Sequence, residues 1–173
     1  MIDLLKNIAD FEDAKTLKLF EEFKFLNNQD FLSKEQILKI LMWKSPRPKH
    51  FYNSNSEEKI KEVTSIAFKT DNDSLKIHIL TALKGVSYPA ASAILMFHNP
   101  QEFGVIDIRV WRQLYKAKLV HTNSIGQNFS LNECEIFYQV IRKLATEMNL
   151  SARQVEKRIF DYDKETQEGN LYK

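Results

Sequence analysis

Residues 74–111, SLKIHILTALKGVSYPAASAILMFHNPQEFGVIDIRVW, are the stretch from which the fold of this chain is inferred. Apolar residues recur at helical spacing in its first third, as they do on one face of a helix. Gly85 allows the left-handed turn that ends such a helix, and Pro89 suits the first turn of the next one. The stretch therefore predicts a buried helical hairpin over residues 74–97, followed by a third helix that begins after Asp107.

The rest of the chain also favours helices. Only 4 Gly and 4 Pro occur among 173 residues, which leaves few residues for the many turns of an all-β fold. Serine followed three residues later by Gln or Glu, the signature of a helix start, occurs at Ser33, Ser130 and Ser151. We therefore predict an all-α fold in a single domain that spans residues 1–173.

Composition excludes several classes of protein. Cys134 is the only cysteine, so an intramolecular disulfide and a cysteine-rich zinc or iron–sulfur site are excluded. The four histidines show no metal-ligand spacing, and no metal site built from side chains is predicted. Neither a signal peptide nor an apolar run of about 20 residues is found. We expect no membrane partner and a cytoplasmic location, associated with the nucleoid if the source is bacterial.

Two segments of the opening stretch carry a resemblance to a known family. Residues 83–87, LKGVS, are followed after a second helix by residues 105–110, VIDIRV. This order and spacing resemble the core of the helix-hairpin-helix DNA glycosylase superfamily, in which the hairpin precedes a catalytic aspartate. The resemblance covers about a quarter of the chain.

The resemblance implies an architecture, a partner and a catalytic group. Two helical lobes would flank a cleft, lobe one formed by residues 1–32 and 107–173 and lobe two by residues 33–106. The partner would be double-stranded DNA. Asp107 would be the catalytic residue.

The chain departs from the family pattern at three positions. Ser87 stands where a second hairpin glycine is usual, and Lys84 stands where proline is common. Pro89 aligns with the lysine that forms a Schiff base in the bifunctional members, and proline has no amine. The expectation is therefore a monofunctional glycosylase, a hydrolase without lyase activity that uses water as the nucleophile.

Asp107 supports two interpretations. Aspartate directly before a helix is a favoured N-cap. An ionised carboxylate in an apolar cleft would also stabilise the positive charge that develops on a sugar as its bond to the base breaks. The helix N-terminus, Arg109 and Arg112 favour the ionised form. The two arginines are also predicted to contact DNA.

The hairpin turn is predicted to bind a DNA phosphate, because backbone N–H groups are unpaired where a tight turn enters a helix. The other interpretation is an ordinary pair of antiparallel helices joined at a glycine. In the resembling family a monovalent cation also binds the carbonyl groups of the turn, here near Leu83, Gly85 and Val86. The predicted DNA-binding residues at the turn are Lys84, Gly85, Val86, Ser87 and Tyr88.

Residues 43–52, WKSPRPKHFY, interleave cations with aromatic rings. Two prolines predict a loop without helix, in which cations meet phosphates and rings stack on bases or enter the duplex. The other interpretation is a surface loop whose aromatic rings close over the core. Lys44, Arg47 and Lys49 are the predicted DNA contacts, and Trp43, Phe51 and Tyr52 are the predicted base pocket or wedge.

Two other functions fit the sequence. A non-catalytic helix-hairpin-helix module would bind DNA without a base pocket. A helical protein-interaction domain would need neither DNA binding nor a base pocket. The formal net charge of +2 neither proves nor excludes a nucleic-acid partner, and so modest a charge favours the protein-interaction domain. Binding to duplex DNA that weakens steeply with salt would exclude the protein-interaction domain, and release of a base would separate the other two.

Overall fold

A computed structural model describes residues 1–9 and 11–168, and these residues form an all-helical protein, which confirms the predicted fold class. The caps predicted at Ser33, Ser130 and Ser151 are all present as reciprocal capping boxes. The helices are α1 (Ile2–Lys6), α2 (Ala14–Glu22), the 3-10 helix η1 (Leu26–Asn28), α3 (Lys34–Lys44), α4 (Lys49–Asn53), α5 (Glu57–Lys69), α6 (Asp73–Leu80), α7 (Tyr88–His98), α8 (Ile108–Lys116), α9 (Leu131–Met148) and α10 (Ala152–Thr166).

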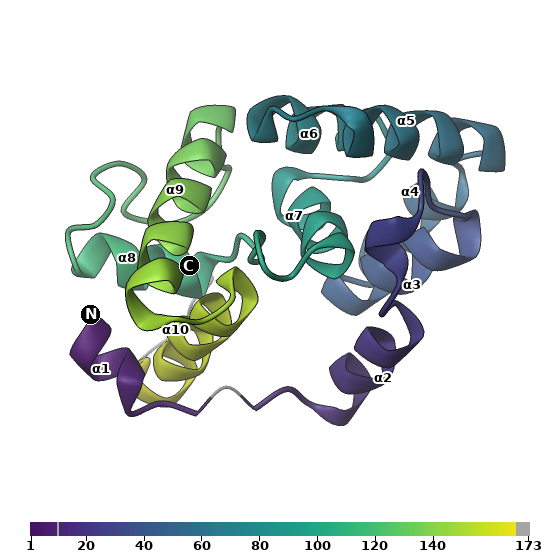
Figure 1. Ribbon diagram of the computed structural model, residues 1–173. Coiled ribbons are helices and arrows are strands. Elements are labelled where there is room, and N and C mark those ends of the chain that lie inside the picture. The colour runs from purple at the N-terminus through teal and green to yellow at the C-terminus, as the bar shows by residue number, and fades with distance from the viewer. Residues whose placement is uncertain (10, 169–173) are drawn as a thin grey trace.

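The helices pack in two sets (Figure 1). One set contains α1, α8, α9 and α10, and the other contains α2 to α7 with η1. The segment that connects α1 to α2 runs along the lower side of Figure 1, from the first set to the second. The two sets also meet where α6 packs against α9.

Helix α7 lies at the centre of the second set because its residues are apolar on every side. Residues 90–97 are all buried, and the three alanines among them let neighbouring helices approach closely. The Phe97 ring is contacted by Phe20, Phe23 and Trp43, with ring centroids 5.1, 5.9 and 5.0 Å away. Residues 14–32 therefore belong with α3 and α7, whereas the predicted lobes grouped them with residues 107–173.

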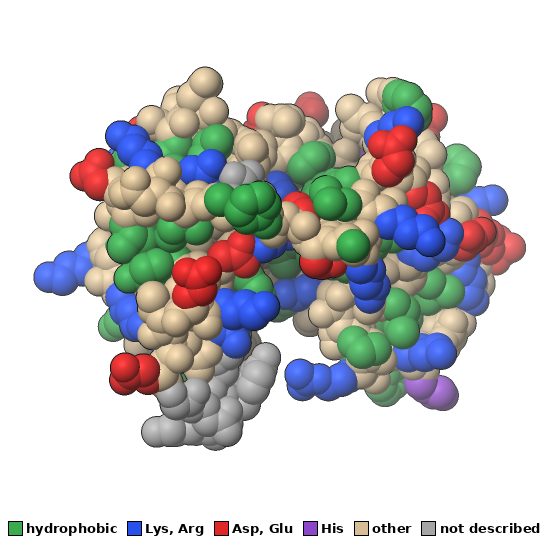
Figure 2. Space-filling view, turned by 90° about the horizontal axis from the view of Figure 1, so that it is seen from below, with side chains coloured by type: hydrophobic (Ala, Val, Ile, Leu, Met, Phe, Trp, Pro, Cys, Tyr) green, Lys and Arg blue, Asp and Glu red, His purple; other side chains and the backbone are tan. Residues whose placement is uncertain are grey.

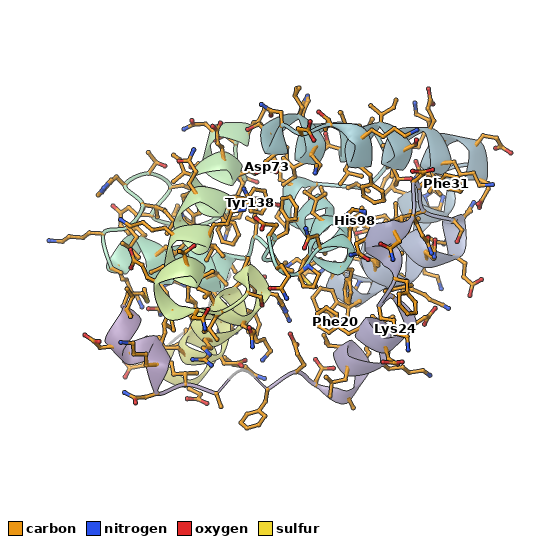
Figure 3. The ribbon with its side chains drawn as sticks, in the orientation of Figure 1. Phe20, Lys24, Phe31, Asp73, His98 and Tyr138 are labelled. Carbon is orange, nitrogen blue, oxygen red and sulfur yellow. The ribbon has the colours of Figure 1, made fainter. Side chains whose placement is uncertain are left out.

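Ion pairs join α9 to the start of α6 and to the segment that follows α7. Arg142 Nη1 lies 2.5 Å from Asp73 Oδ2, and Arg142 Nε lies 3.2 Å from Glu102 Oε2. Figure 3 shows Asp73 at the start of α6, beside the helix that carries Tyr138. The Arg142 guanidinium also stacks over the rings of Phe103 and Tyr138, at 4.9 and 5.7 Å from the centroids. These contacts fix the hairpin against the first set of helices.

The prediction that residues 43–52 contain no helix was wrong. Helix α4 begins at Lys49, and Pro48 occupies its N-cap position. Both prolines therefore precede the helix, where their missing N–H groups break no helical hydrogen bond. The spacing of Ser54 and Glu57 also predicts a helix start at Ser54, but the N-cap of α5 is Ser56.

Candidate functional site

A cleft of about 790 Å³ lies where four parts of the chain meet. Its walls come from the segment between α1 and α2, the end of α3, the residues that precede α8, and one face of α10. The lower side of the molecule is hollowed in the middle, with Lys and Arg side chains on both sides of the hollow (Figure 2). The cleft is therefore built from residues that are far apart in the sequence.

Asp107 lines this cleft and caps α8, so the N-cap interpretation is confirmed. Its Oδ1 accepts the Arg109 N–H at 3.0 Å. Its Oδ2 lies 2.8 Å from Nζ of Lys44, the last residue of α3. The side chains of Asp107 and Lys44 are 20% and 16% exposed, so the ion pair is largely shielded from water but open to the cleft.

The surroundings of Asp107 keep its carboxylate ionised. Burial by itself would raise the pKa, but the charge and hydrogen bond of Lys44 and the N–H and charge of Arg109 more than offset it. The net effect is a pKa below the usual value for aspartate. The sequence indicated the contribution of Arg109, but not that of Lys44, which lies 63 residues away.

A buried ionic cluster forms the inner wall of the cleft. Arg153, on α10, binds Glu12 through two nitrogens, at 2.6 and 2.9 Å, and also pairs with Glu156. Glu156 accepts the N–H of Val105, at 3.2 Å. Burial raises the pKa of Glu156, and Arg153 and the Val105 N–H offset part of the rise. Residue 12 is thus held to α10, and the connecting segment lies along the cleft.

The sequence analysis missed this cluster. Its only local signal is a charged pair, Arg153 and Glu156, at i and i+3 beside the apolar residues of α10. The main partner of Arg153 is 141 residues away, so no sequence pattern connects the two.

The hairpin turn is fixed from the side by Asn55. The Asn55 side chain accepts the N–H of Lys84 at 2.8 Å and donates to the Lys84 carbonyl at 3.1 Å. Val86 is buried, and its N–H is bonded to the Leu83 carbonyl at 3.1 Å. Ser87 is the N-cap residue of α7, but its side chain makes no capping bond. The first-turn N–H groups of α7 therefore have no side-chain cap. A phosphate could bind these groups only if no side chain already does.

The remaining predicted residues lie in different surroundings. Arg109 donates to Asp163 at 3.0 Å and to Gln167 at 2.6 Å, so its charge is balanced inside the protein. Arg112 is half-buried on α8. Tyr88 shares a hydrogen bond of 2.9 Å with His78 beside the hairpin. Lys44 thus forms the ion pair with the Asp107 carboxylate, whereas the Arg109 guanidinium pairs with Asp163 and acts on Asp107 only through its charge.

The aromatic residues of 43–52 separate into three environments. Trp43 lines the cleft, and its Nε1 donates to Thr16 at 2.8 Å. Tyr52 is 1% exposed and packs in the core, so the predicted role in a base pocket or wedge does not fit. Phe51 is exposed, and its Cβ lies beside the hairpin glycine. Arg47 and Lys49 are exposed at the start of α4.

Replacing Gly85 by alanine, which adds one methyl group, is expected to destabilise the hairpin turn. Its φ is 82°, and an added Cβ would lie 2.8 Å from the Phe51 Cβ and 3.1 Å from the Tyr52 ring. We expect Gly85→Ala to lower the free energy of unfolding by about 2–4 kcal/mol, measured by urea denaturation.

Gly126→Ala is the matched control for Gly85→Ala. Gly126 has a φ of 71°, but the nearest atom to an added Cβ is 3.2 Å away. Backbone strain and a milder contact with the Ile108 carbonyl are expected there, at about 1–2 kcal/mol. Equal losses in the two variants would show that contact with α4 does not fix the hairpin turn.

Comparison with known proteins gives no relative. No protein-family model matches the chain, and no curated protein and no solved structure matches it either. Within the described part of the chain, no helix has both the length and the apolar character needed to cross a membrane.

Proposed function

We propose that this protein is a DNA glycosylase that removes a damaged or modified base from duplex DNA. The observation that carries the proposal is the position of Asp107. Its carboxylate is kept ionised, opens onto a cleft of about 790 Å³ and follows a helical hairpin whose second helix has no side-chain cap. The resemblance of residues 83–87 and 105–110 to helix-hairpin-helix glycosylases supports the same function.

Asp107 supplies the electrostatic part of the reaction. Breaking the bond between base and sugar leaves positive charge on the sugar, and a fixed negative charge nearby lowers the energy of that state. The depressed pKa makes this carboxylate a weak base but a persistent anion. Stabilisation of the sugar cation, rather than proton abstraction, is therefore its role.

The hairpin supplies the DNA contact. The N–H groups at the start of α7 and the positive end of its helix dipole face a backbone phosphate. The Leu83 carbonyl already accepts the Val86 N–H, so a monovalent cation at the turn depends mainly on the carbonyls of Gly85 and Val86. Exposed Lys84, at the turn, and exposed Arg47 and Lys49, beside α4, add positive charge around this phosphate.

The two sets of helices take the place of the two lobes of a glycosylase, with the cleft between them. A glycosylase extrudes its target base from the duplex at a cost of a few kcal/mol and holds it against apolar walls. Trp43 and Phe160 are aromatic residues in the wall of the cleft. Phe51, whose exposed ring lies on α4 beside the hairpin turn, is the residue that we expect to enter the duplex.

The test of this proposal is a panel of duplexes, each with one damaged, mismatched or modified base. Release of one of these bases, scored by alkaline cleavage of the resulting abasic site, is the expected result. Binding without release from any duplex would favour the non-catalytic DNA-binding module. Absence of salt-sensitive binding to duplex DNA would contradict a DNA function altogether.

Lys84→Gln tests the phosphate contact. We expect weaker binding to all duplexes alike, and a fall of about one in the slope of log affinity against log salt. Lys24→Gln is the control, because Lys24 pairs with Glu21 on α2, away from the hairpin. A change in preference between sequences, or an equal effect of both variants, would contradict the assignment.

A further inference from the structure

We infer that Ser92 is a positioning residue for Asp107, and that its hydroxyl fixes the backbone from which the carboxylate projects. This inference rests on the proposed function. Ser92 is on α7, the second helix of the hairpin, and carries the only side-chain hydroxyl among the buried residues 90–97. A polar group buried in such an apolar run needs hydrogen-bond partners, and those of Ser92 lie at the site.

The Ser92 hydroxyl links two parts of the site. It accepts the N–H of Ile106 at 2.9 Å and donates to the Pro89 carbonyl at 2.8 Å. Ile106 directly precedes Asp107, and Pro89 is in the first turn of α7, whose N–H groups form the proposed phosphate site. One hydroxyl therefore joins the backbone next to the carboxylate to the start of the hairpin helix.

Val105 is held from the other set of helices. Its N–H donates to Glu156 of α10 at 3.2 Å, and Glu156 is buried. Gly104 permits this approach, because an added Cβ would lie 2.8 Å from the Glu156 Cβ. Figure 1 shows the segment after α7 passing here from the second set of helices to the first. Ser92 and Glu156, one from each set, therefore hold the two residues before Asp107.

The position of this backbone decides the position of the carboxylate, because the aspartate side chain is short. The Asp107 carboxylate binds the Arg109 N–H at 3.0 Å and the Lys44 ammonium at 2.8 Å, and both contacts depend on where residue 107 lies. A catalytic group displaced by about 1 Å can lose about a hundredfold in rate. Loss of the bond between Ser92 and Ile106 should therefore slow the reaction without weakening the hold on DNA.

Ser92→Ala tests the inference, because it removes the hydroxyl and adds no atom. We expect the single-turnover rate of base release, measured with saturating protein, to fall about ten- to a hundredfold. The dissociation constant for the same duplex should change less than about twofold, since the N–H groups of the hairpin and Lys84 remain.

Thr64→Val is the matched control. The buried hydroxyl of Thr64, on α5, makes the same pair of bonds, accepting the Leu32 N–H at 2.9 Å and donating to the Ile60 carbonyl at 2.8 Å. Each variant leaves one buried N–H without its partner, so both should unfold at a lower urea concentration than the wild type. Only Ser92→Ala should slow base release. An equal slowing in both would show that the role of Ser92 is merely structural.

A double variant shows whether Ser92 acts through Asp107. When Asp107→Asn is already present, Ser92→Ala should slow base release less than about threefold further, since the carboxylate that it positions is gone. Rate losses that multiply in the double variant would overturn the inference.

The pKa of Asp107 gives a measurement that needs no DNA. Burial raises this pKa, but Lys44 and the Arg109 N–H bring it below the usual value. Both contacts loosen if residue 107 moves, so the pKa should rise in Ser92→Ala and stay unchanged in Thr64→Val. It is followed by nuclear magnetic resonance of the carboxyl carbon during a pH titration. An unchanged pKa in Ser92→Ala would contradict the inference.

The outcomes separate this inference from the proposed function. Base release at the wild-type rate by Ser92→Ala would overturn the role of Ser92 and leave the glycosylase proposal standing. If the wild type releases no base from any duplex, base excision is contradicted. A pKa of Asp107 that rises in Ser92→Ala alone would then still support the positioning of the carboxylate by Ser92.

Discussion

Asp107→Asn is expected to slow base release by about a hundred- to a thousandfold. Asparagine has nearly the same shape and is an equally good helix N-cap, so α8 should still begin at the same residue. What is lost is the negative charge beside the sugar. The rate is measured by single-turnover cleavage of the duplex from which the wild type releases a base.

Asp161→Asn is the matched control for Asp107→Asn. Asp161 also lines the cleft, but it is on α10 and pairs with Lys157. Its replacement should change the rate less than about threefold, since it caps no helix at the proposed site. Urea denaturation of both variants shows whether a slower rate reflects lost folding. Base release at the wild-type rate by Asp107→Asn would remove the carboxylate from the mechanism.

Arg153→Met is expected to give the largest loss of stability, about 3–5 kcal/mol in the free energy of unfolding. Arg153 is 7% exposed and neutralises Glu12 and Glu156, of which Glu156 is 2% exposed. Methionine fills a similar volume but leaves both carboxylates without their cation. The loss is measured by urea denaturation at neutral pH.

The loss in Arg153→Met is also expected to depend on pH. Burial already raises the pKa of Glu156, and removal of the guanidinium takes away the charge that opposes the rise. A carboxyl whose folded pKa is above its unfolded value binds more protons when folded, so stability falls as pH rises above the unfolded value. The difference from wild type should therefore be smaller near pH 4 than at pH 7.

A triple variant separates uncompensated charge from lost packing. Combining Arg153→Met with Glu12→Gln and Glu156→Gln removes all three charges of the cluster, and most of the lost stability should return. A triple variant as unstable as Arg153→Met alone would show that packing of the arginine, rather than neutralisation of the carboxylates, is what stabilises the cleft wall.

Local interactions explain why the sequence predicted the helices. The capping boxes at Ser33, Ser130 and Ser151 each join residues three positions apart, so a short pattern contains all the information that they need. The same holds for the cap at Asp107, whose Oδ1 binds an N–H two residues on. A proline prevents a helix when it lies inside one, but it is tolerated when it lies at or before the first residue. This explains why α4 was missed although the sequence showed both prolines.

The sequence by itself determined the all-helical fold, the hairpin and the candidate carboxylate, because each depends on residues near one another in the chain. Only the tertiary structure decided what surrounds that carboxylate. Lys44 and Asp107 are 63 residues apart, and Glu12 and Arg153 are 141 apart. These partners meet because apolar burial fixes the packing of the helices, and buried charges then remain only where that packing supplies a counter-charge.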